Sequence, residues 1–170
     1  MRTPMDAAIS KTKGMVGGVR AGRTGLVGVF RTLSEQHSEA GALCDRIKKH
    51  PDKRHHLWQR LRVSLLSHEK AELLEVYPVI RHHGGEAMAD HHEAEATQIE
   101  QMIIRLDAMD YHESEWMPMF AQITSSVLQH AHEEERDIFP EAQRLIGEPL
   151  AKELDRLYQK TQKAVVGTVA

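Results

Sequence analysis

The sequence predicts an all-α protein, an antiparallel up-down four-helix bundle followed by a short fifth helix. Helix-forming residues dominate the composition, and aromatic residues make up only 5% of the chain. Apolar residues recur at alternating steps of three and four along four long stretches, which is the pattern of amphipathic helices. Short loops separate these stretches. With 170 residues, of which 41% are hydrophobic, the chain is long enough to bury one core.

Residues 1–23 differ from the rest because they combine glycines with lysines and arginines. Such a basic, glycine-rich lead is expected to be a flexible arm. Thr24 can N-cap a first helix that runs to about His50 and ends before Pro51. The apolar face of this helix consists of Leu26, Phe30, Leu33, His37, Ala40, Cys44 and Ile47.

Two further helices should follow. Asp52 can cap the second helix, and Pro78 should kink or end it. The Gly84–Gly85 pair makes a turn, after which a third helix covers about residues 86–109. The inward face of the second helix consists of Trp58, Leu61, Leu65, His68, Glu72 and Val76.

The fourth helix can be capped by Ser114, is interrupted by Pro140 and closes near Gly147. Its inward face consists of Phe120, Ile123, Val127, His130, Glu134 and Ile138. A fifth helix starts at Pro149 and reaches about Val165. The expected organisation is therefore an arm (1–23), a four-helix bundle (24–147) and a C-terminal helix with its tail (148–170).

The second and fourth helices contain a partial internal repeat. His68-x-x-x-Glu72 is followed by Tyr77-Pro78, and His130-x-x-x-Glu134 is followed by Phe139-Pro140 at the same spacing. Residues four apart lie on one face of a helix, so each histidine and glutamate can point to the same place. The repeat predicts that the two helices are equivalent elements of the bundle.

Histidine is unusually frequent, with 12 of 170 residues. Several of the histidines and two glutamates fall on the inward faces, where a carboxylate is rarely buried unless it is paired or binds a metal. A metal centre would neutralise the carboxylates and use the imidazole lone pairs. These inward residues are His37, His68, Glu72, His130 and Glu134.

The third helix offers two registers. Strict alternation of four and three steps places His92 on the inward face, whereas a second register through His91 and Glu95 repeats the His-x-x-x-Glu spacing. We take His91 as the ligand and keep His92 as the alternative. On the fourth helix Glu135 is a lesser alternative to Glu134.

The complete candidate ligand set has four imidazoles, three carboxylates and no thiolate. Such a set suits iron or manganese better than a closed structural zinc site, and it is large enough for two ions bridged by carboxylates. Ferritin-like di-iron proteins use Glu-x-x-His instead, a spacing that does not occur here. The candidate ligands are His37, His68, Glu72, His91, Glu95, His130 and Glu134.

This pattern, over about residues 24–146, resembles the hemerythrin-like, or HHE cation-binding, family. The resemblance implies two iron ions with an oxo or hydroxo bridge inside the bundle. Glu72 and Glu134 match the bridging carboxylates, and the histidines match terminal ligands. The departure is Glu95, since oxygen-carrying hemerythrins have histidine at that position. The full pattern is similar to that of mycobacterial hemerythrin-like proteins associated with peroxide decomposition.

An additional anionic ligand lowers the charge of the cluster and should favour the ferric state. A diferric centre suits peroxide better than reversible oxygen carriage, so we expect a catalase-like enzyme of oxidative or nitrosative stress defence. The alternatives are a protein that binds or senses oxygen or nitric oxide, and an iron donor for cluster repair. The expected partner is accordingly a small molecule, namely peroxide, oxygen or nitric oxide.

Charge and hydropathy argue against other classes. The net charge of −3 gives no electrostatic case for nucleic acid as a partner. No apolar run approaches the length of a membrane span, and no secretion signal is evident, so we expect a cytoplasmic protein. We further expect a monomer or weak homodimer. The single cysteine, Cys44, excludes an internal disulfide and a cysteine-rich metal site.

Overall fold

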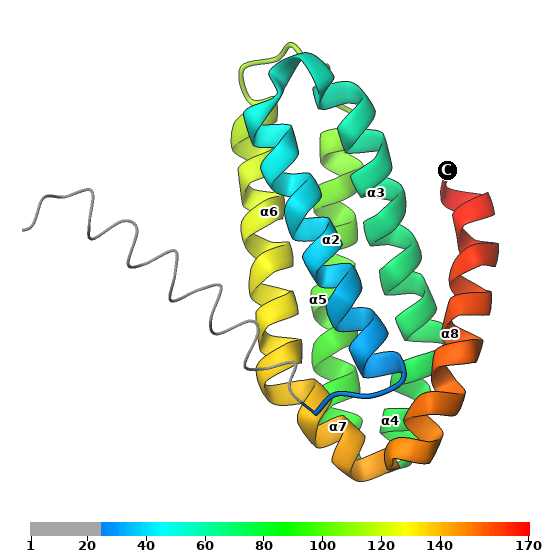
Figure 1. The fold of residues 1–170 in the computed structure, drawn as a ribbon. Coiled ribbons are helices and arrows are strands. Elements are labelled where there is room, and N and C mark those ends of the chain that lie inside the picture. The colour runs from blue at the N-terminus through cyan, green and yellow to red at the C-terminus, as the bar shows by residue number, and fades with distance from the viewer. Residues whose placement is uncertain (1–24) are drawn as a thin grey trace, which may run out of the picture.

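The computed structural model describes residues 25–170, and in this part of the chain it contains helices and no strand. Four long helices form the predicted bundle, and a further long helix lies beside it (Figure 1). The predicted fold class is therefore confirmed. The flexible arm expected for residues 1–23 lies outside the described residues. The long helices are α2 (Val29–Lys49), α3 (Arg54–Ala71), α5 (Glu86–Asp107), α6 (Trp116–Glu133) and α8 (Glu148–Val169).

The predicted caps of α3 and α6 are not used. A 3-10 turn, η1 (Pro51–Lys53), precedes α3, so Asp52 lies within this turn and α3 begins without a side-chain cap. The backbone N–H of Trp116 bonds to the carbonyl of Glu113, so Ser114 lies within the preceding turn and α6 begins after Glu115. Both predictions were wrong because a local turn takes up the residues that were expected to cap the helix.

The two prolines of the internal repeat neither end their helices nor leave them regular. The π-helical segment η2 (Glu72–Val76) leads into α4 (Tyr77–His82), and η3 (Glu134–Ile138) leads into α7 (Phe139–Ile146). A proline lacks an N–H and collides with the carbonyl four residues earlier, and a widened turn just before it relieves both problems. Such π segments are frequent at functional sites. Here each one begins at the glutamate of a His-x-x-x-Glu pair.

The bundle interior has two apolar layers. One is built around Phe30, Ile80 and Phe139 at the end where α4 and α7 lie, and the other around Trp58, Trp116 and Phe120 at the opposite end. On each of the four bundle helices, one inward histidine falls between the residues of these two layers. The sequence therefore places a polar layer across the middle of an otherwise apolar core.

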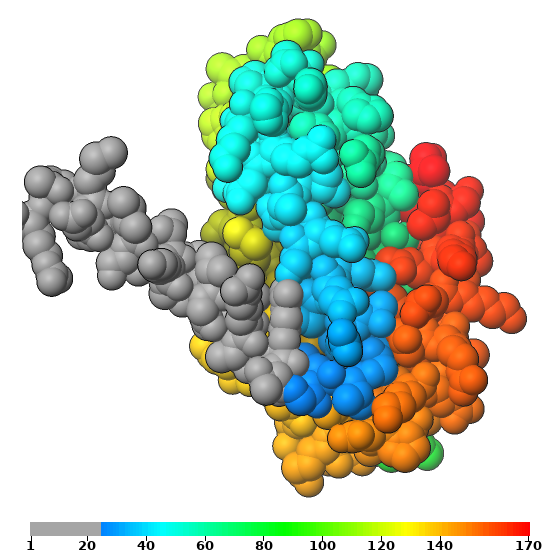
Figure 2. Space-filling model, in the orientation of Figure 1, coloured from blue at the N-terminus to red at the C-terminus, as the bar shows by residue number. Residues whose placement is uncertain are grey.

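The fifth helix does not cap one end of the bundle. It runs along the side and packs against α2, α3 and η2 (Figures 1 and 2). Its inward residues Leu154 and Tyr158 belong to the core, together with Ala151. The helix α8 therefore covers the part of the bundle where the first His-x-x-x-Glu pair lies.

Gly28 lies where α8 closely approaches the start of α2, and its lack of a side chain makes room for the backbone of α8. It has a positive φ of 55°, and a Cβ added there would collide with the backbone of Ala151. We expect Gly28→Ala to lower the free energy of unfolding by about 2 kcal/mol more than Gly25→Ala does, because the collision with Ala151 adds to the backbone strain that both variants share. Gly25 is the matched control, since its φ is 93° and no described atom lies within 4 Å of its added Cβ. Urea denaturation measures the difference, and equal losses would contradict the close packing.

Candidate metal centre

The polar layer consists of four histidines and three glutamates that come from all four bundle helices. The carboxylates belong to the α3–η2 and α6–η3 pairs, and each histidine comes from a different helix. All seven side chains are nearly or fully buried. The members of the polar layer are His37, His68, Glu69, Glu72, His92, His130 and Glu134.

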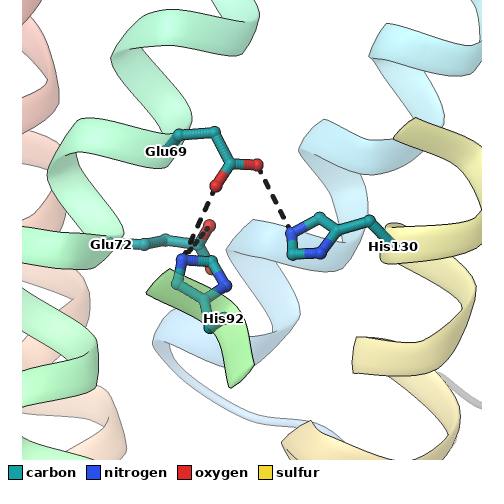
Figure 3. Close-up of side chains that lie close together, drawn as sticks. All are labelled: Glu69, Glu72, His92 and His130. Carbon is teal, nitrogen blue, oxygen red and sulfur yellow. Dashed lines mark ion pairs between the residues drawn. The ribbon is translucent and has the colours of Figure 1, made fainter. Parts of the chain in front are cut away.

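One half of the polar layer is formed by Glu69, Glu72, His92 and His130 (Figure 3). The two oxygens of Glu69 lie 3.5 Å from Nε2 of His92 and 3.4 Å from Nε2 of His130. Glu72 Oε2 lies 3.9 Å from the same His92 nitrogen. One donor atom from each of these residues lies within 4.8 Å of the others, so a single cation could contact all four.

The other half is formed by His37, His68 and Glu134. The Nε2 atoms of the two histidines are 3.2 Å apart. Glu134 Oε2 lies 3.3 Å from Nε2 of His37. The three donor atoms again converge on one small volume.

Two carboxylates connect the halves. Glu72, whose Oε2 faces His92, also lies 3.1 Å from Nε2 of His68 through the same oxygen. Glu134 lies 3.0 Å from Nδ1 of His92 and 3.4 Å from Nε2 of His130. Each carboxylate therefore faces both halves, which is the position that a carboxylate bridging two ions requires.

The polar layer is not satisfied by its own hydrogen bonds. Among residues 25–170, buried side-chain atoms without a hydrogen-bond partner include both oxygens of Glu72, both ring nitrogens of His92, and Nε2 of His130. Buried polar atoms in folded proteins are almost always bonded. The unbonded atoms here are carboxylate oxygens and imidazole nitrogens, which are donors to divalent transition metals. The residues present therefore fit bound metal ions.

The pKa values of the two connecting carboxylates are shifted in opposite directions. Burial raises the pKa of Glu72 well above its ordinary value, and the charges of Glu134 and Glu69 raise it further. Burial also raises the pKa of Glu134, but the charge of His130 and the close contacts with His37 and His92 lower it well below the ordinary range. Without a metal, the negative charge of Glu134 is stabilised by the neighbouring histidines.

The two equivalent histidines of the internal repeat, His68 and His130, also have pKa values that are shifted in opposite directions. Burial lowers the pKa of His68 to about 3, so its ring is neutral. Burial also lowers the pKa of His130, but the charge of Glu134 and the contact with Glu69 raise it to about 11. A cation bound to Nε2 of His130 would replace that proton, since a metal ligand must be deprotonated.

The structure corrects the preferred register of the third helix. His92 is fully buried in the polar layer, whereas the side chain of His91 is 46% exposed. The buried residues of α5 follow strict alternation, because the inward face is set by two apolar layers above and below His92. They are Ala89, His92, Ala96, Ile99, Ile103 and Leu106.

Glu95 lies at the edge of the polar layer rather than within it. It forms a separate, partly exposed group with His91 and Glu133. Its Oε2 also lies 2.7 Å from Nδ1 of His130. A carboxylate that accepts the outer N–H of a ligating histidine fixes the orientation of that ring. Glu95 thus contacts the outer nitrogen of His130 rather than the interior of the polar layer. Glu135 has the same relation to His37, since its Oε1 lies 3.0 Å from Nδ1 of that ring.

Glu69 was missed by sequence reasoning. It lies next to His68 and three residues before Glu72, so it shares the inward face with Glu72. That i, i+3 relation was the available signal. With Glu69 and His92 in place of Glu95 and His91, the polar layer still has four imidazoles and three carboxylates.

A small pocket lies directly beside the polar layer. Its walls include the apolar side chains of Ala40, Leu65 and Val127. Its polar lining consists of Gln36, His37, Ser64, His68, Glu69 and His130. Its volume is about 20 Å³, and about 10–15 Å³ is enough for one water-sized molecule. The volume of the pocket is therefore that of a very small ligand.

Comparison with protein families gives a match over most of the bundle. A family model described as the hemerythrin HHE cation binding domain matches residues 28–142. Neither curated proteins nor solved structures give a match. Within residues 25–170, the helices are too short or too polar to cross a membrane.

Proposed function

The chain belongs to the hemerythrin HHE cation-binding family, and from this membership we propose that it is a non-haem di-iron protein that decomposes hydrogen peroxide. Metal binding follows from the family and from the buried groups of histidine and glutamate. The single observation that supports the finer proposal is the composition of the polar layer, with a third carboxylate, Glu69, among the candidate ligands.

The proposed ligands divide between two iron ions. His92, His130 and Glu69 would hold one ion, and His37 and His68 would hold the other. Glu72 and Glu134 would bridge them, because each faces both halves of the polar layer. Iron is favoured over structural zinc since mixed imidazole and carboxylate sets that hold two ions are typical of non-haem iron, whereas structural zinc prefers a closed site of four ligands.

The third carboxylate bears on the choice of reaction. A carboxylate adds one negative charge to the cluster, which favours ferric iron and lowers its reduction potential. Because reversible oxygen binding starts from ferrous iron, an iron pair that rests in the ferric state is better suited to peroxide. Glu69 takes the role of third anionic ligand that the sequence assigned to Glu95, since its two oxygens face His92 and His130.

When bound, the iron pair would supply the two-electron redox change of the reaction. One hydrogen peroxide gives up two electrons and two protons and becomes O₂, and a second hydrogen peroxide takes both and becomes two molecules of water. The residues around the pocket would admit peroxide and exclude larger molecules. Glu95 and Glu135 would hold the rings of His130 and His37 in place through their outer nitrogens.

The second candidate function is binding or sensing of oxygen or nitric oxide. The specific observation in its favour is the same pocket, since apolar walls and a volume of about 20 Å³ suit a diatomic gas as well as peroxide. Iron donation for cluster repair has weaker support. The candidate ligands are buried at the centre of the bundle, and Cys44 is buried too.

Oxygen evolution from hydrogen peroxide by the iron-loaded protein tests the proposal. We expect turnover in the wild type, and a loss of about ten- to hundred-fold in Glu69→Gln, because the variant removes one anionic ligand. Glu93→Gln is the matched control, since Glu93 is an exposed carboxylate that pairs with Arg81, and it should keep the wild-type rate.

Two outcomes would count against the proposal. An iron-loaded wild type that evolves no oxygen, yet changes its absorption reversibly with oxygen or nitric oxide, would support the second candidate function. Full turnover in Glu69→Gln would show that the third carboxylate does not set the reaction.

A further inference from the structure

The amide of Gln36 on α2 contacts the candidate ligand His68 on the side of its ring that faces away from the polar layer. Its Oε1 atom lies 2.9 Å from Nδ1 of His68, the ring nitrogen that faces away from the polar layer. The same oxygen accepts a hydrogen bond of 2.7 Å from the hydroxyl of Tyr158 and one of 2.9 Å from Nε2 of Gln162. Three groups therefore converge on one amide oxygen.

The orientation of this amide is supported by a reciprocal pair. Nε2 of Gln36 donates to Oε1 of Gln162 at 2.9 Å, and Nε2 of Gln162 donates back to Oε1 of Gln36. Reversing one amide alone would place two donors and two acceptors face to face. The pair therefore couples the two amides, and in the observed arrangement the oxygen of Gln36 faces His68.

The position of the oxygen determines where the neutral ring of His68 carries its proton. An amide oxygen only accepts, so Nδ1 at 2.9 Å must carry the hydrogen. The lone pair then remains on Nε2, which lies 3.1 Å from Glu72 and faces the other donors of the polar layer. This is the tautomer in which His68 can bind a metal through Nε2.

We propose that Gln36 is a positioning residue for His68, held in place by Tyr158 and Gln162 of α8, so that the fifth helix is part of the metal centre. The proposal deepens the proposed function and rests on it for the role of the metal. The family match ends at residue 142, whereas α8 begins at Glu148. The positioning device therefore lies partly beyond the matched domain.

The packing of α8 supports a fixed arrangement. The side chain of Tyr158 is fully buried, so its hydroxyl has little freedom to leave Gln36. Thr161 of α8 donates a 2.6 Å hydrogen bond to Glu75 within η2, the segment that begins at Glu72. The helix thus contacts the ring of His68 directly, through the hydroxyl of Tyr158 at 3.2 Å from Nδ1, and also through Gln36. It also contacts the backbone segment that carries the neighbouring carboxylate.

The internal repeat makes the role of Gln36 specific to one half of the polar layer. His130 is the equivalent of His68, but its Nδ1 faces the carboxylate of Glu95 at 2.7 Å. A carboxylate increases the basicity of a ligating imidazole more than a neutral amide does. The two equivalent histidines therefore differ in the charge of the group behind them.

The tautomer can be measured without any metal, from the ¹⁵N and ¹H shifts of the histidine rings in the metal-free full-length protein. The expected result is a proton on Nδ1 of His68 in the wild type and in Gln36→Glu, whose carboxylate also accepts. In Gln36→Leu the proton should no longer be confined to Nδ1. A wild-type ring with its proton on Nε2 would overturn the proposal, as would an unchanged ring in Gln36→Leu.

A ferrous iron titration then tests the consequence for binding. We expect Gln36→Leu to weaken one of two binding events by about ten- to hundred-fold, with Gln36→Glu close to the wild type. Gln159→Leu is the matched control on α8, since its amide bonds only to the nearby Asp155 among the contacts of the described residues. Equal affinities in all variants would overturn the positioning role. If the wild type bound no iron, the proposed function would fail, while the ring measurement would still decide the tautomer.

Discussion

Glu134→Gln is expected to lower the iron content of the purified protein by at least about ten-fold. Glu134 contacts three histidines, His37, His92 and His130, and therefore serves both halves of the polar layer. Glutamine keeps the size of the side chain but removes its negative charge and one of its two anionic donor oxygens. Loss of a bridging ligand should therefore weaken the binding of both ions rather than of one alone.

Glu133→Gln is the control for this prediction. Glu133 precedes Glu134 directly but is partly exposed and lies 3.2 Å from His91, outside the polar layer. Metal analysis of the two variants, prepared in parallel, should show near wild-type iron in Glu133→Gln. Iron in Glu134→Gln at the wild-type level would contradict the bridging role.

Removal of the metal should produce the second large effect, a loss of thermal stability. The ions would neutralise three buried carboxylates. Burial raises the pKa of Glu72. Burial also acts to raise the pKa values of Glu69 and Glu134, but nearby histidines lower both. Binding at about a thousand times the dissociation constant adds roughly 4 kcal/mol to the unfolding free energy. For a domain of this size that corresponds to roughly 10 °C in Tm.

Differential scanning calorimetry with and without a chelator measures this loss. The Glu134→Gln variant should melt at the same temperature under both conditions, because it has little metal to lose. A wild-type protein whose Tm does not change on chelation would indicate that the polar layer is stable without ions.

Most of the polar layer could be predicted because it lies on regular helices. His37, His68, Glu72, His130 and Glu134 fall on inward faces set by apolar neighbours at steps of three and four, and the structure brings all five together. The internal repeat identified the glutamates at which the two π segments begin. Local periodicity was sufficient for these residues.

The third helix shows where local periodicity was misread. Two adjacent histidines can each start a register, and the His-x-x-x-Glu spacing drew attention to His91. The structure buries His92 instead, since Ala89 and Ala96 stand three residues before it and four after it on the same face. Spacing between polar residues therefore carried less information than the spacing of the small apolar residues around them.

The remaining parts of the site depend on tertiary contacts. Glu69 belongs to the polar layer because α5 and α6 bring His92 and His130 to its two oxygens. Gln36 faces Tyr158, which is 122 residues away along the chain. The i, i+3 relation of Glu69 to Glu72 was visible in the sequence. The contacts with His92, His130 and Tyr158 join segments that are far apart along the chain, so they could not be predicted from it.

The iron bound per chain by His92→Ala and His91→Ala, compared with the wild type, tests most directly whether the polar layer is a two-iron centre. The wild type should bind about two ions, as expected when seven side chains serve a bridged pair. His91→Ala should bind the same amount, because His91 is a surface residue, whereas His92→Ala should lose at least one ion. Full iron in His92→Ala, or loss of iron only in His91→Ala, would contradict the assignment.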